Sequence, residues 1–442
     1  MNCLILAAGR GSRLSTPGHP KPLIPLLGVP LIERVILTAH KAGLTHFYVV
    51  SGHHGDTVRH FLDTVSPTRN VRITHIINDE WEKENGLSVL KAKDLLVENF
   101  ILLMADHIFD ESILLKLKNQ AITDGEVILA VDYNTQSNTL IDPEDVTNVY
   151  VENDRIHDIG KNLTQYNAYD TGIFLCSPAI FSAVEESIHN GDTSLSGAIK
   201  VMAQRQKAKA FDIRDDYWID VDDHQTLKKA ENRLLATLKK TSDGLISRYV
   251  NRPISTRMTR HLVKMDLTPT QISVVSFILS LLGAYFFFLG GYMNLLIGAV
   301  FAQLSSVIDG CDGEVARLKY QITKFGGWFD AVLDRYADGF LLLGLTYSVY
   351  LTHETFLIIF IGFLAIFGSF MNSYTADKYD GLMKRKLEPG KHYFRIGRDL
   401  RMFIIFLGGL ANQPLLILVL NAVLMNAENI RRIVLVYKNE KG

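Results

Sequence analysis

A chain of 442 residues is long enough for two to three domains, and its net charge of −1 averages a polar first half and a very apolar second half. The three cysteines are too few and too widely spaced for a disulfide framework, and no metal-binding spacing links them. These features exclude a disulfide-stapled secreted scaffold and indicate a reducing, cytoplasmic site for the chemistry.

The first residues predict a phosphate-binding turn. An apolar run from Asn2 to Ala8 is followed by Gly9 to Leu14 (GRGSRL), which indicates a strand, a glycine-rich turn and a basic loop. Exposed backbone N–H groups and arginines in such a turn can hold a triphosphate. Lys21 follows between two prolines. Because no basic n-region or cleavage site precedes the strand, we expect residues 1 to about 240 to be cytoplasmic.

The segments that follow alternate between helical and strand patterns. Helical periodicity covers 30–43, and strand-like runs cover 47–52, 71–77 and 100–104. Asp106 comes directly after the last of these runs. It is therefore expected at the carboxyl edge of a parallel sheet, where ligands of open α/β sheets bind.

These motifs resemble the sugar-phosphate nucleotidylyltransferases, whose pattern L-A-A-G-x-G-[ST]-R-L followed by P-K-P-L is matched from Leu6 to Leu14 and from Pro20 to Leu23. The resemblance implies an α/β nucleotidyltransferase fold with a Rossmann-like mixed sheet over residues 1–240. It also implies that Lys21 is catalytic and that a set of residues binds the nucleotide: Ala7, Ala8, Gly9, Gly11, Arg13, Lys21, Asp106 and, in a turn similar to the family's base-recognition turn, Asn85, Gly86 and Ser88.

The same resemblance implies a magnesium site and an acceptor site in this half. Asp106 is expected as one metal ligand, and the second comes from the segment 218–223 (WIDVDD), with Asp222 preferred to Asp220. Alternatively, Asp220 and Asp223 cap the helix that begins near His224. Lys161 is expected to contact the acceptor phosphate and Asp170 its hydroxyls, although Lys161 also fits an ordinary solvated loop lysine.

Residues 241–268 form a basic amphipathic linker in which aliphatic residues alternate with arginines. Such a stretch before a spanning helix is expected in the bilayer interface, where its arginines serve anionic lipid or substrate. The linker leads into a predicted all-α transmembrane domain, 269–442, with six apolar segments: 270–290, 292–309, 328–351, 354–375, 399–412 and 414–437.

Lysine and arginine are distributed unevenly over the connections between these segments. The turns near 290, 353 and 413 carry none, whereas the linker and the connections 311–327 and 376–401 are rich in both. By the positive-inside rule, the sequence predicts a multi-pass protein of the cell membrane with both termini and both active sites on the cytoplasmic side.

Four aspartates lie within or at the edge of two apolar segments. Asp309 and Asp312 are three residues apart, and Asp330 and Asp334 are four apart, so each pair shares one face of a helix. An unpaired carboxylate in a membrane costs several kcal/mol, so the two pairs indicate a bound cation such as Mg²⁺ or Mn²⁺. Helix caps and loop charges at the membrane surface are the alternative reading.

This stretch resembles the signature of the CDP-alcohol phosphotransferases, D-x2-D-G-x2-A-R-x8-G-x3-D-x3-D, with no departure in spacing or identity. The resemblance implies that Asp309, Asp312 and Asp330 hold metal against the CDP pyrophosphate, with Gly313, Arg317 and Gly326 around the nucleotide. Asp334 would be a metal ligand or the catalytic base. Arg398 and Arg401 lie in the basic connection 376–401, at the entry to the apolar segment 399–412, and are the candidates for binding the phosphate of an anionic acceptor.

The order of the two domains resembles that of bifunctional archaeal enzymes that make the phosphorylated precursor of a heat-protective osmolyte. That resemblance implies that the small-molecule substrates are CTP, inositol 1-phosphate and CDP-inositol. It also implies that the protein lies in a lipid bilayer and forms a homodimer, and no nucleic acid is expected as a partner. Two alternatives are a phospholipid synthase fused to an enzyme that makes another CDP-polyol, and a transporter or scaffold that tethers an inactive enzyme. The sequence leaves the identity of the polyol open.

Overall fold

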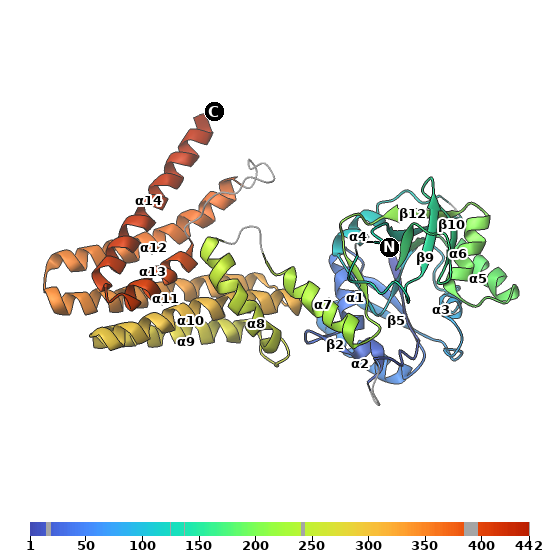
Figure 1. Ribbon diagram of the computed structural model, residues 1–442, viewed down its shortest axis with the longest axis horizontal. Coiled ribbons are helices and arrows are strands. Elements are labelled where there is room, and N and C mark those ends of the chain that lie inside the picture. The colour runs from blue at the N-terminus through green and yellow to red at the C-terminus, as the bar shows by residue number, and fades with distance from the viewer. Residues whose placement is uncertain (15–18, 124, 137, 240–243, 384–396, 442) are drawn as a thin grey trace. The chain divides into compact units, whose positions relative to one another are not determined.

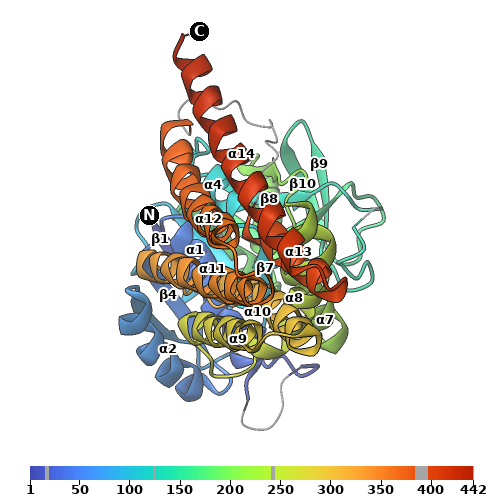
Figure 2. The ribbon, with the colours of Figure 1, turned by 90° about the vertical axis from the view of Figure 1, so that its left-hand side faces the viewer.

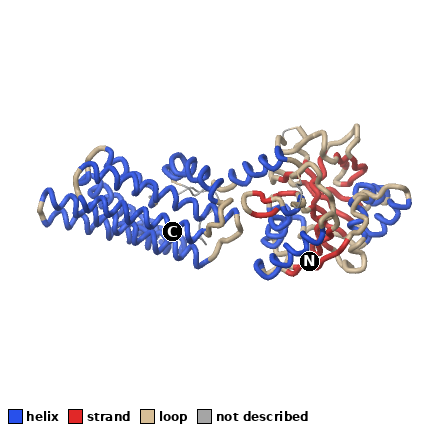
Figure 3. Tube along the Cα trace, turned by 90° about the horizontal axis from the view of Figure 1, so that it is seen from below, coloured by secondary structure: helices blue, strands red, loops and turns tan. Residues whose placement is uncertain are grey.

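The computed structural model describes residues 1–14, 19–123, 125–136, 138–239, 244–383 and 397–441. The chain divides into two compact units, Met1–Arg233 and Leu234–Gly442. Strands gather in the first unit, and the described part of the second consists of helices and loops (Figure 3). The predicted combination of a mixed-sheet α/β fold with a helical membrane region is confirmed.

The first unit is built on a mixed sheet whose order along its width differs from the chain order. Nine of its described strands are hydrogen-bonded in the order β5 (Arg72–Ile77), β4 (His46–Ser51), β1 (Asn2–Ala7), β6 (Phe100–Met104), β11 (Ala168–Cys176), β8 (Val127–Asp132), β12 (Ala208–Asp212), β10 (Arg155–Gly160) and β9 (Asn148–Glu152). β4, β5 and β6 join β1 in a parallel block, and β11 pairs antiparallel with β6 and β8. β1 and β6 end at one edge, which places their following turns together.

Helices cover both faces of this sheet, as Figure 1 shows. One apolar core contains residues of α1 (Leu31–Lys41), α2 (Gly55–Arg69) and α4 (Glu111–Leu117). The other contains residues of α3 (Asn85–Leu90), α5 (Ala179–His189) and α6 (Leu195–Gln204). Strand β8 is buried along its whole length because it contacts both cores, which explains its continuous apolar run.

Five short elements lie around the sheet edge of the first unit. They are η1 (Lys21–Leu23), the antiparallel pair β2 (Pro25–Leu26) and β3 (Val29–Pro30), and the antiparallel pair β7 (His107–Phe109) and β13 (Trp218–Asp220). Helix α7 (His224–Ala236) follows β13, and the Asp223 carboxylate accepts a hydrogen bond from the Thr226 N–H at 2.7 Å. This contact is the predicted cap for Asp223, whereas Asp220 lies in the strand.

After the end of α7, the described part of the second unit continues with η2 (Ser247–Asn251) and α8 (Arg252–Leu262) and then with six longer helices (Figure 2). These are α9 (Pro269–Leu289), α10 (Tyr292–Leu318), α11 (Lys324–His353), α12 (Phe356–Met383), α13 (Arg398–Leu410) and α14 (Pro414–Lys441). Thr268 caps α9 with a capping box, and Gly290 ends it at a φ of 67°. Each of these six helices covers all or most of one of the six predicted apolar segments.

Small residues let the first helices of this unit approach closely. A Cβ on Gly298 of α10 would lie 2.7 Å from the Gly283 carbonyl of α9, and a Cβ on Gly344 of α11 would lie 2.7 Å from the Ala284 carbonyl. In a membrane the hydrophobic effect does not drive helices together, because lipid tails are as apolar as the side chains. Close backbone packing of this kind stabilises the helix pairs instead.

Among the described helices, four are long and apolar enough to cross a membrane: α9, α10, α12 and α14. The chain is therefore a membrane protein. Helix α13 has 13 residues and spans about 20 Å, less than the roughly 30 Å of a hydrocarbon core. Helix α11 is long, but its first half carries the aspartates, so its apolar stretch is interrupted. Part of the basic connection 376–401, residues 384–396, lies outside the described residues.

The amphipathic helix α8 is tied to α10 by a buried carboxylate. The Glu314 side chain is fully buried and pairs with Arg252 at 2.5 Å. It also accepts hydrogen bonds from Ser255 at 2.7 Å and Thr259 at 2.6 Å. One face of the predicted interfacial helix is thus packed on the helix that carries Asp309.

We expect Glu314→Ala to destabilise the second unit by about 3 kcal/mol, because three donors on α8, of which Ser255 and Thr259 are buried, lose their common acceptor. Glu314→Gln keeps the shape and one acceptor oxygen, so its effect should be smaller. Thermal denaturation in detergent, followed by circular dichroism, measures both. Equal stability of the alanine variant and the parent would contradict this account of the contact.

Candidate active sites

The first site forms where the turn after β1 meets Lys21. The side chains and backbone of this region line a cavity of about 340 Å³: Leu6, Ala7, Gly9, Gly11, Ser12, Arg13, Lys21, Pro22, Ala105, Asp106 and Asp222. Gly11 has a φ of 58°, and a Cβ there would lie 2.5 Å from that of Lys21. The glycine thus allows the turn to close over the lysine.

Lys21 is the central cation of this cavity, and only 5% of it is exposed. Its Nζ lies 2.5 Å from Asp106 Oδ2, donates a hydrogen bond to Asp222 Oδ1 and lies 4.0 Å from Asp220 Oδ1. Burial by itself would lower the pKa of Lys21, but the three carboxylates outweigh it and raise the pKa above its usual value. The lysine therefore carries a fixed positive charge beside the triphosphate turn.

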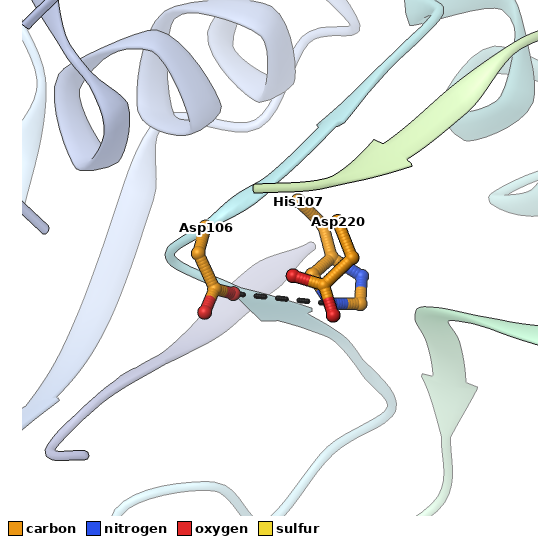
Figure 4. A group of neighbouring side chains, drawn as sticks. All are labelled: Asp106, His107 and Asp220. Atoms are coloured by element: carbon orange, nitrogen blue, oxygen red, sulfur yellow. Dashed lines mark ion pairs between the residues drawn. The ribbon is translucent and has the colours of Figure 1, made fainter. Parts of the chain in front are cut away.

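The pairing of β7 with β13 brings His107, which follows Asp106, next to Asp220. Asp220 lies directly opposite His107 in the antiparallel register, so both side chains leave the same face. His107 Nε2 lies 3.5 Å from Asp220 Oδ2 and 3.8 Å from Asp106 Oδ1 (Figure 4). These three residues form a group whose ligand atoms lie within 4.8 Å of one another.

The charges of this group shift one another's pKa values. Burial would lower the pKa of His107, but Asp220 and Asp106 raise it to about 10. Burial would raise the pKa of Asp220, but His107 and Lys21 lower it. The pKa of Asp222 is raised by burial and by the neighbouring Asp220 carboxylate. The cluster is therefore a tightly coupled set of charges.

The structure places Asp222 with cations rather than in the three-residue group. Arg13 contacts Asp222 Oδ2 at 2.9 Å and Asp145 Oδ2 at 2.5 Å, and Lys161 contacts Asp145 Oδ1 at 2.7 Å. A continuous ion-pair chain thus leads from the cavity to Lys161, the predicted acceptor contact. Asp145 was not anticipated, and nothing in its local sequence distinguishes it from other loop carboxylates.

Asp170 and Ala8 lie beside this site but do not line the cavity. Asp170 Oδ1 accepts a hydrogen bond from the Gly172 N–H at 2.7 Å. Burial raises the pKa of Asp170 to about 6, against the opposing effects of that hydrogen bond and His107. Ala8 is buried in the core.

The predicted base-recognition residues on α3 are held by packing. Asn85 Oδ1 accepts a hydrogen bond from the Leu195 N–H at 2.9 Å, and Ser88 accepts one from Asn78 at 3.0 Å. A Cβ on Gly86 would lie 2.5 Å from the Thr193 carbonyl. None of these three residues lines the 340 Å³ cavity.

We expect Gly86→Ala to destabilise the first unit by about 1 to 3 kcal/mol, because its methyl group overpacks the contact between α3 and the start of α6. Denaturant unfolding of the first unit, followed by the fluorescence of its tryptophans, measures the change. Gly9→Ala is the control, since a Cβ at Gly9 meets nothing within 4 Å. If only the apparent affinity for nucleotide changed in Gly86→Ala, its role would be binding and not packing.

The second site joins the four-aspartate motif on two helices. Carboxylate oxygens of Asp309 on α10 and of Asp330 and Asp334 on α11 lie within 4.8 Å of one another. Asp312 lies one turn from Asp309 and accepts a hydrogen bond from Ser273 of α9. An oxygen-only group of this kind has the donor chemistry that Mg²⁺ and Mn²⁺ prefer.

Gly313 and Arg317 lie in the last two turns of α10, and Gly326 lies in the first turn of α11. Arg317 folds back along α10, since a Cβ on Gly313 would lie 3.4 Å from its Nη1. The Gly326 N–H donates to Thr323 Oγ1 at 2.9 Å, which caps α11. These residues border the aspartates and take part in local helix structure.

Arg398 and Arg401, on α13, lie beside the aspartates but in different surroundings. Arg398 Nη1 is 3.0 Å from Asp309 Oδ2 and 2.9 Å from Asp334 Oδ1, so it neutralises the cluster directly. Arg401 is buried and pairs with Asp338 at 2.6 Å. Asp338 also contacts Arg398 at 3.3 Å and accepts a hydrogen bond from Ser369 at 2.9 Å.

Sequence reasoning missed two residues that carried a usable signal. Asp338 is four residues after Asp334, so the spacing that paired Asp330 with Asp334 continues for one more helical turn. His107 directly follows Asp106 at the end of a strand. Glu314, inside the motif, was missed because only the fold shows that α8 covers it.

Comparisons with known proteins agree with this division of the chain. Residues 3–207 match the family of MobA-like NTP transferase domains, and residues 266–427 match the CDP-alcohol phosphatidyltransferase family. The chain is 34% identical to the bifunctional IPC transferase and DIPP synthase of Rubrobacter xylanophilus, over 97% of this chain and 95% of that protein. It is 32% identical to the protein of the same name in Aquifex aeolicus, over 99% of this chain and 98% of that protein. A solved structure of the inositol-1-phosphate CTP transferase from T. maritima is 26% identical and covers 52% of this chain and 96% of its own, with a TM-score of 0.46.

Proposed function

The chain belongs to the family of bifunctional IPC transferases and DIPP synthases, and from this we propose that it makes and then consumes CDP-inositol. The first unit joins CTP to inositol 1-phosphate and releases pyrophosphate. The second transfers phospho-inositol from CDP-inositol to a second inositol 1-phosphate, which gives di-myo-inositol-phosphate phosphate and CMP. The observation that carries this proposal is that the similarity to these relatives extends over nearly the whole chain and includes both units.

In the first reaction, a phosphate oxygen of inositol 1-phosphate attacks the α-phosphorus of CTP in line with the departing pyrophosphate. The Lys21 ammonium and the Arg13 guanidinium face the cavity and stabilise the charge that develops on the triphosphate. The ion-pair chain from Arg13 through Asp145 to Lys161 supports an acceptor phosphate near Lys161. Asp170 is proposed to accept the inositol hydroxyls.

In the second reaction, an acceptor hydroxyl attacks the inositol-bearing phosphorus of CDP-inositol, and CMP leaves. Asp334 takes the hydroxyl proton. Arg398 is positioned by three carboxylates and grips the acceptor phosphate. Arg401 holds Asp338, so we assign it to the support of Arg398.

Enzymes of this family depend on a divalent metal, and both carboxylate groups fit one. In the second unit, Asp309, Asp312, Asp330 and Asp334 would hold Mg²⁺ or Mn²⁺. In the first, Asp106 and Asp220 fit best, because Asp220 Oδ1 is buried and accepts no hydrogen bond. Asp222 is the counter-ion of Lys21 and Arg13. A bound metal would neutralise phosphate charge in both reactions.

We infer that both termini and both sites face the cytoplasm, which the distribution of lysine and arginine supports. A homodimer in the bilayer is proposed by resemblance alone. Cysteine labelling from either side of intact cells tests the orientation, and cross-linking in membranes tests the dimer.

A phospholipid synthase is the alternative, and it is not favoured, because the full-length relatives combine the same two activities in one chain. The deciding experiment incubates membranes that contain the protein with CTP, Mg²⁺ and a panel of polyol phosphates, and identifies products by mass. CDP-inositol and a water-soluble inositol phosphodiester are expected. A CDP-polyol from another substrate, or a product that partitions into organic solvent, would overturn the assignment.

A further inference from the structure

The geometry around His107 points to a metal ligand, and we propose that the first unit holds its divalent ion through a mixed set of Asp106, His107 and Asp220. The oxygen-only site in the second unit would then differ from it in ion preference. This inference rests on the proposed function of the first unit and adds a donor and a selectivity to it.

The tautomer of His107 leaves one ring nitrogen for a metal. Its Nδ1 lies 2.7 Å from the Thr171 carbonyl oxygen, which can only accept, so Nδ1 carries the proton and donates it. Nε2 points at the carboxylates (Figure 4), and a divalent ion that binds there would take the place of the Nε2 proton. A backbone carbonyl on the second ring nitrogen is the usual arrangement for a metal-bound histidine.

The distances from Nε2 fit two ligands of one ion better than hydrogen bonds. At 3.5 Å to Asp220 Oδ2 and 3.8 Å to Asp106 Oδ1, both separations exceed the 2.7 to 3.2 Å typical of an N–H···O bond. Two atoms bound to one ion at about 2.1 Å lie about 3 to 4.2 Å apart, depending on the angle between them.

The surroundings fix the ring in this orientation. Gly172 has a φ of 71°, and a Cβ there would lie 2.4 Å from His107 Nδ1, so only glycine admits the ring against β11. The Trp218 ring packs 5.9 Å away on the neighbouring strand. Only 13% of the His107 side chain is exposed. A ring held so firmly on two strands is preorganised for one position of Nε2.

The oxygens that face His107 are not the ones that hold Lys21. Lys21 contacts Oδ2 of Asp106, whereas His107 faces Oδ1. Oδ2 of Asp220 faces His107, and its Oδ1 is buried without a hydrogen-bond partner. The lysine and a metal ion can therefore use the same carboxylates at once.

An imidazole donor changes which ion the site prefers. Mg²⁺ favours an oxygen-only shell, and replacing one oxygen by a nitrogen donor shifts the preference of a site away from Mg²⁺ towards Mn²⁺ and the later divalent ions. Because the group of the second unit, among the residues that the structure describes, consists of the carboxylates of Asp309, Asp330 and Asp334, the two sites differ in donor type. Replacing Mg²⁺ by Mn²⁺ should thus lower the metal concentration needed for pyrophosphate release more than that needed for CMP release.

Pulsed EPR of Mn²⁺ tests the ligand without reference to activity. The full-length Asp309→Asn/Asp330→Asn variant removes two ligands of the second site, so substoichiometric Mn²⁺ reports on the first. We expect nuclear modulation from one directly bound histidine nitrogen, which changes when histidine is labelled with ¹⁵N. His107→Gln should remove the coupling, and His75→Gln should keep it, since His75 pairs with Asp63 elsewhere.

The variant His107→Asp tests whether the histidine determines the preference of the first site for Mn²⁺ over Mg²⁺. It replaces the nitrogen donor by oxygen, so the ratio of apparent Mn²⁺ to Mg²⁺ affinity in pyrophosphate release should fall at least about tenfold. Bound Mn²⁺ without histidine coupling, in labelled protein that still makes CDP-inositol, would overturn this inference and leave the proposed function intact. Absence of CDP-inositol under every metal condition would instead reject the proposed function.

Discussion

Lys21→Met should reduce CDP-inositol formation by on the order of 10²- to 10³-fold while leaving CMP release from supplied CDP-inositol unchanged. The variant keeps the length of the side chain but removes the cation that Asp106 and Asp222 hold in the cavity. The triphosphate then loses its buried positive partner. Pyrophosphate release, measured with CTP and inositol 1-phosphate, quantifies the first activity, and CMP release quantifies the second.

The matched control is Lys116→Met. Lys116 is an exposed lysine that pairs with Asp216 at 2.6 Å and does not line the cavity. It should leave both activities at the parent level. Normal pyrophosphate release in Lys21→Met would show that the charge at Lys21 does not serve the chemistry.

Asp330→Asn should have the reciprocal effect and reduce CMP release at least about 100-fold, with pyrophosphate release retained. Asn keeps the shape of Asp but removes the charge that a divalent ion needs from the group of Asp309, Asp330 and Asp334. CMP is measured by chromatography after addition of CDP-inositol and inositol 1-phosphate.

Asp377→Asn is the control for this change, because Asp377 is an exposed carboxylate on α12 that lies 3.8 Å from Arg335. Its CMP release should match the parent. Full turnover in Asp330→Asn would favour the transporter or scaffold reading, in which the aspartates have no chemical role. If Lys21→Met loses only pyrophosphate release and Asp330→Asn loses only CMP release, the protein has two independent active sites and not one shared site.

Local signals were sufficient wherever the chemistry was contiguous in the chain. The turn after β1, the lysine between prolines and the four-aspartate motif each lie within a short segment, and the structure places them after β1, in η1 and on α10 and α11. The apolar segments likewise predicted the six long helices. Their exact lengths were less accurate: α10 continues to Leu318, past the predicted end at 309, and carries Asp312 on that extension, while α11 starts at Lys324, four residues before its predicted segment.

Residues distant in sequence required the tertiary structure. The choice between Asp220 and Asp222 depends on strand register, since alternate residues of β13 and its following turn point to different neighbours. Asp222 meets Lys21, 201 residues away, and Asp220 meets His107. Likewise, Arg398 and Arg401 are both arginines in one basic segment, but only the fold shows that Arg398 reaches Asp309 and Asp334 whereas the ion pair given for Arg401 is with Asp338.

The sequence by itself determined the two families, the order of the units, the apolar helices and the acidic and glycine-rich motifs, because each depends on neighbouring residues and on the periods of helix and strand. The tertiary structure alone decided which carboxylate faces which cation, that His107 joins the first cluster, and that Glu314 fastens α8 to α10. These contacts depend on strand pairing and helix packing between distant segments, and no local pattern encodes which of several similar charged side chains will meet.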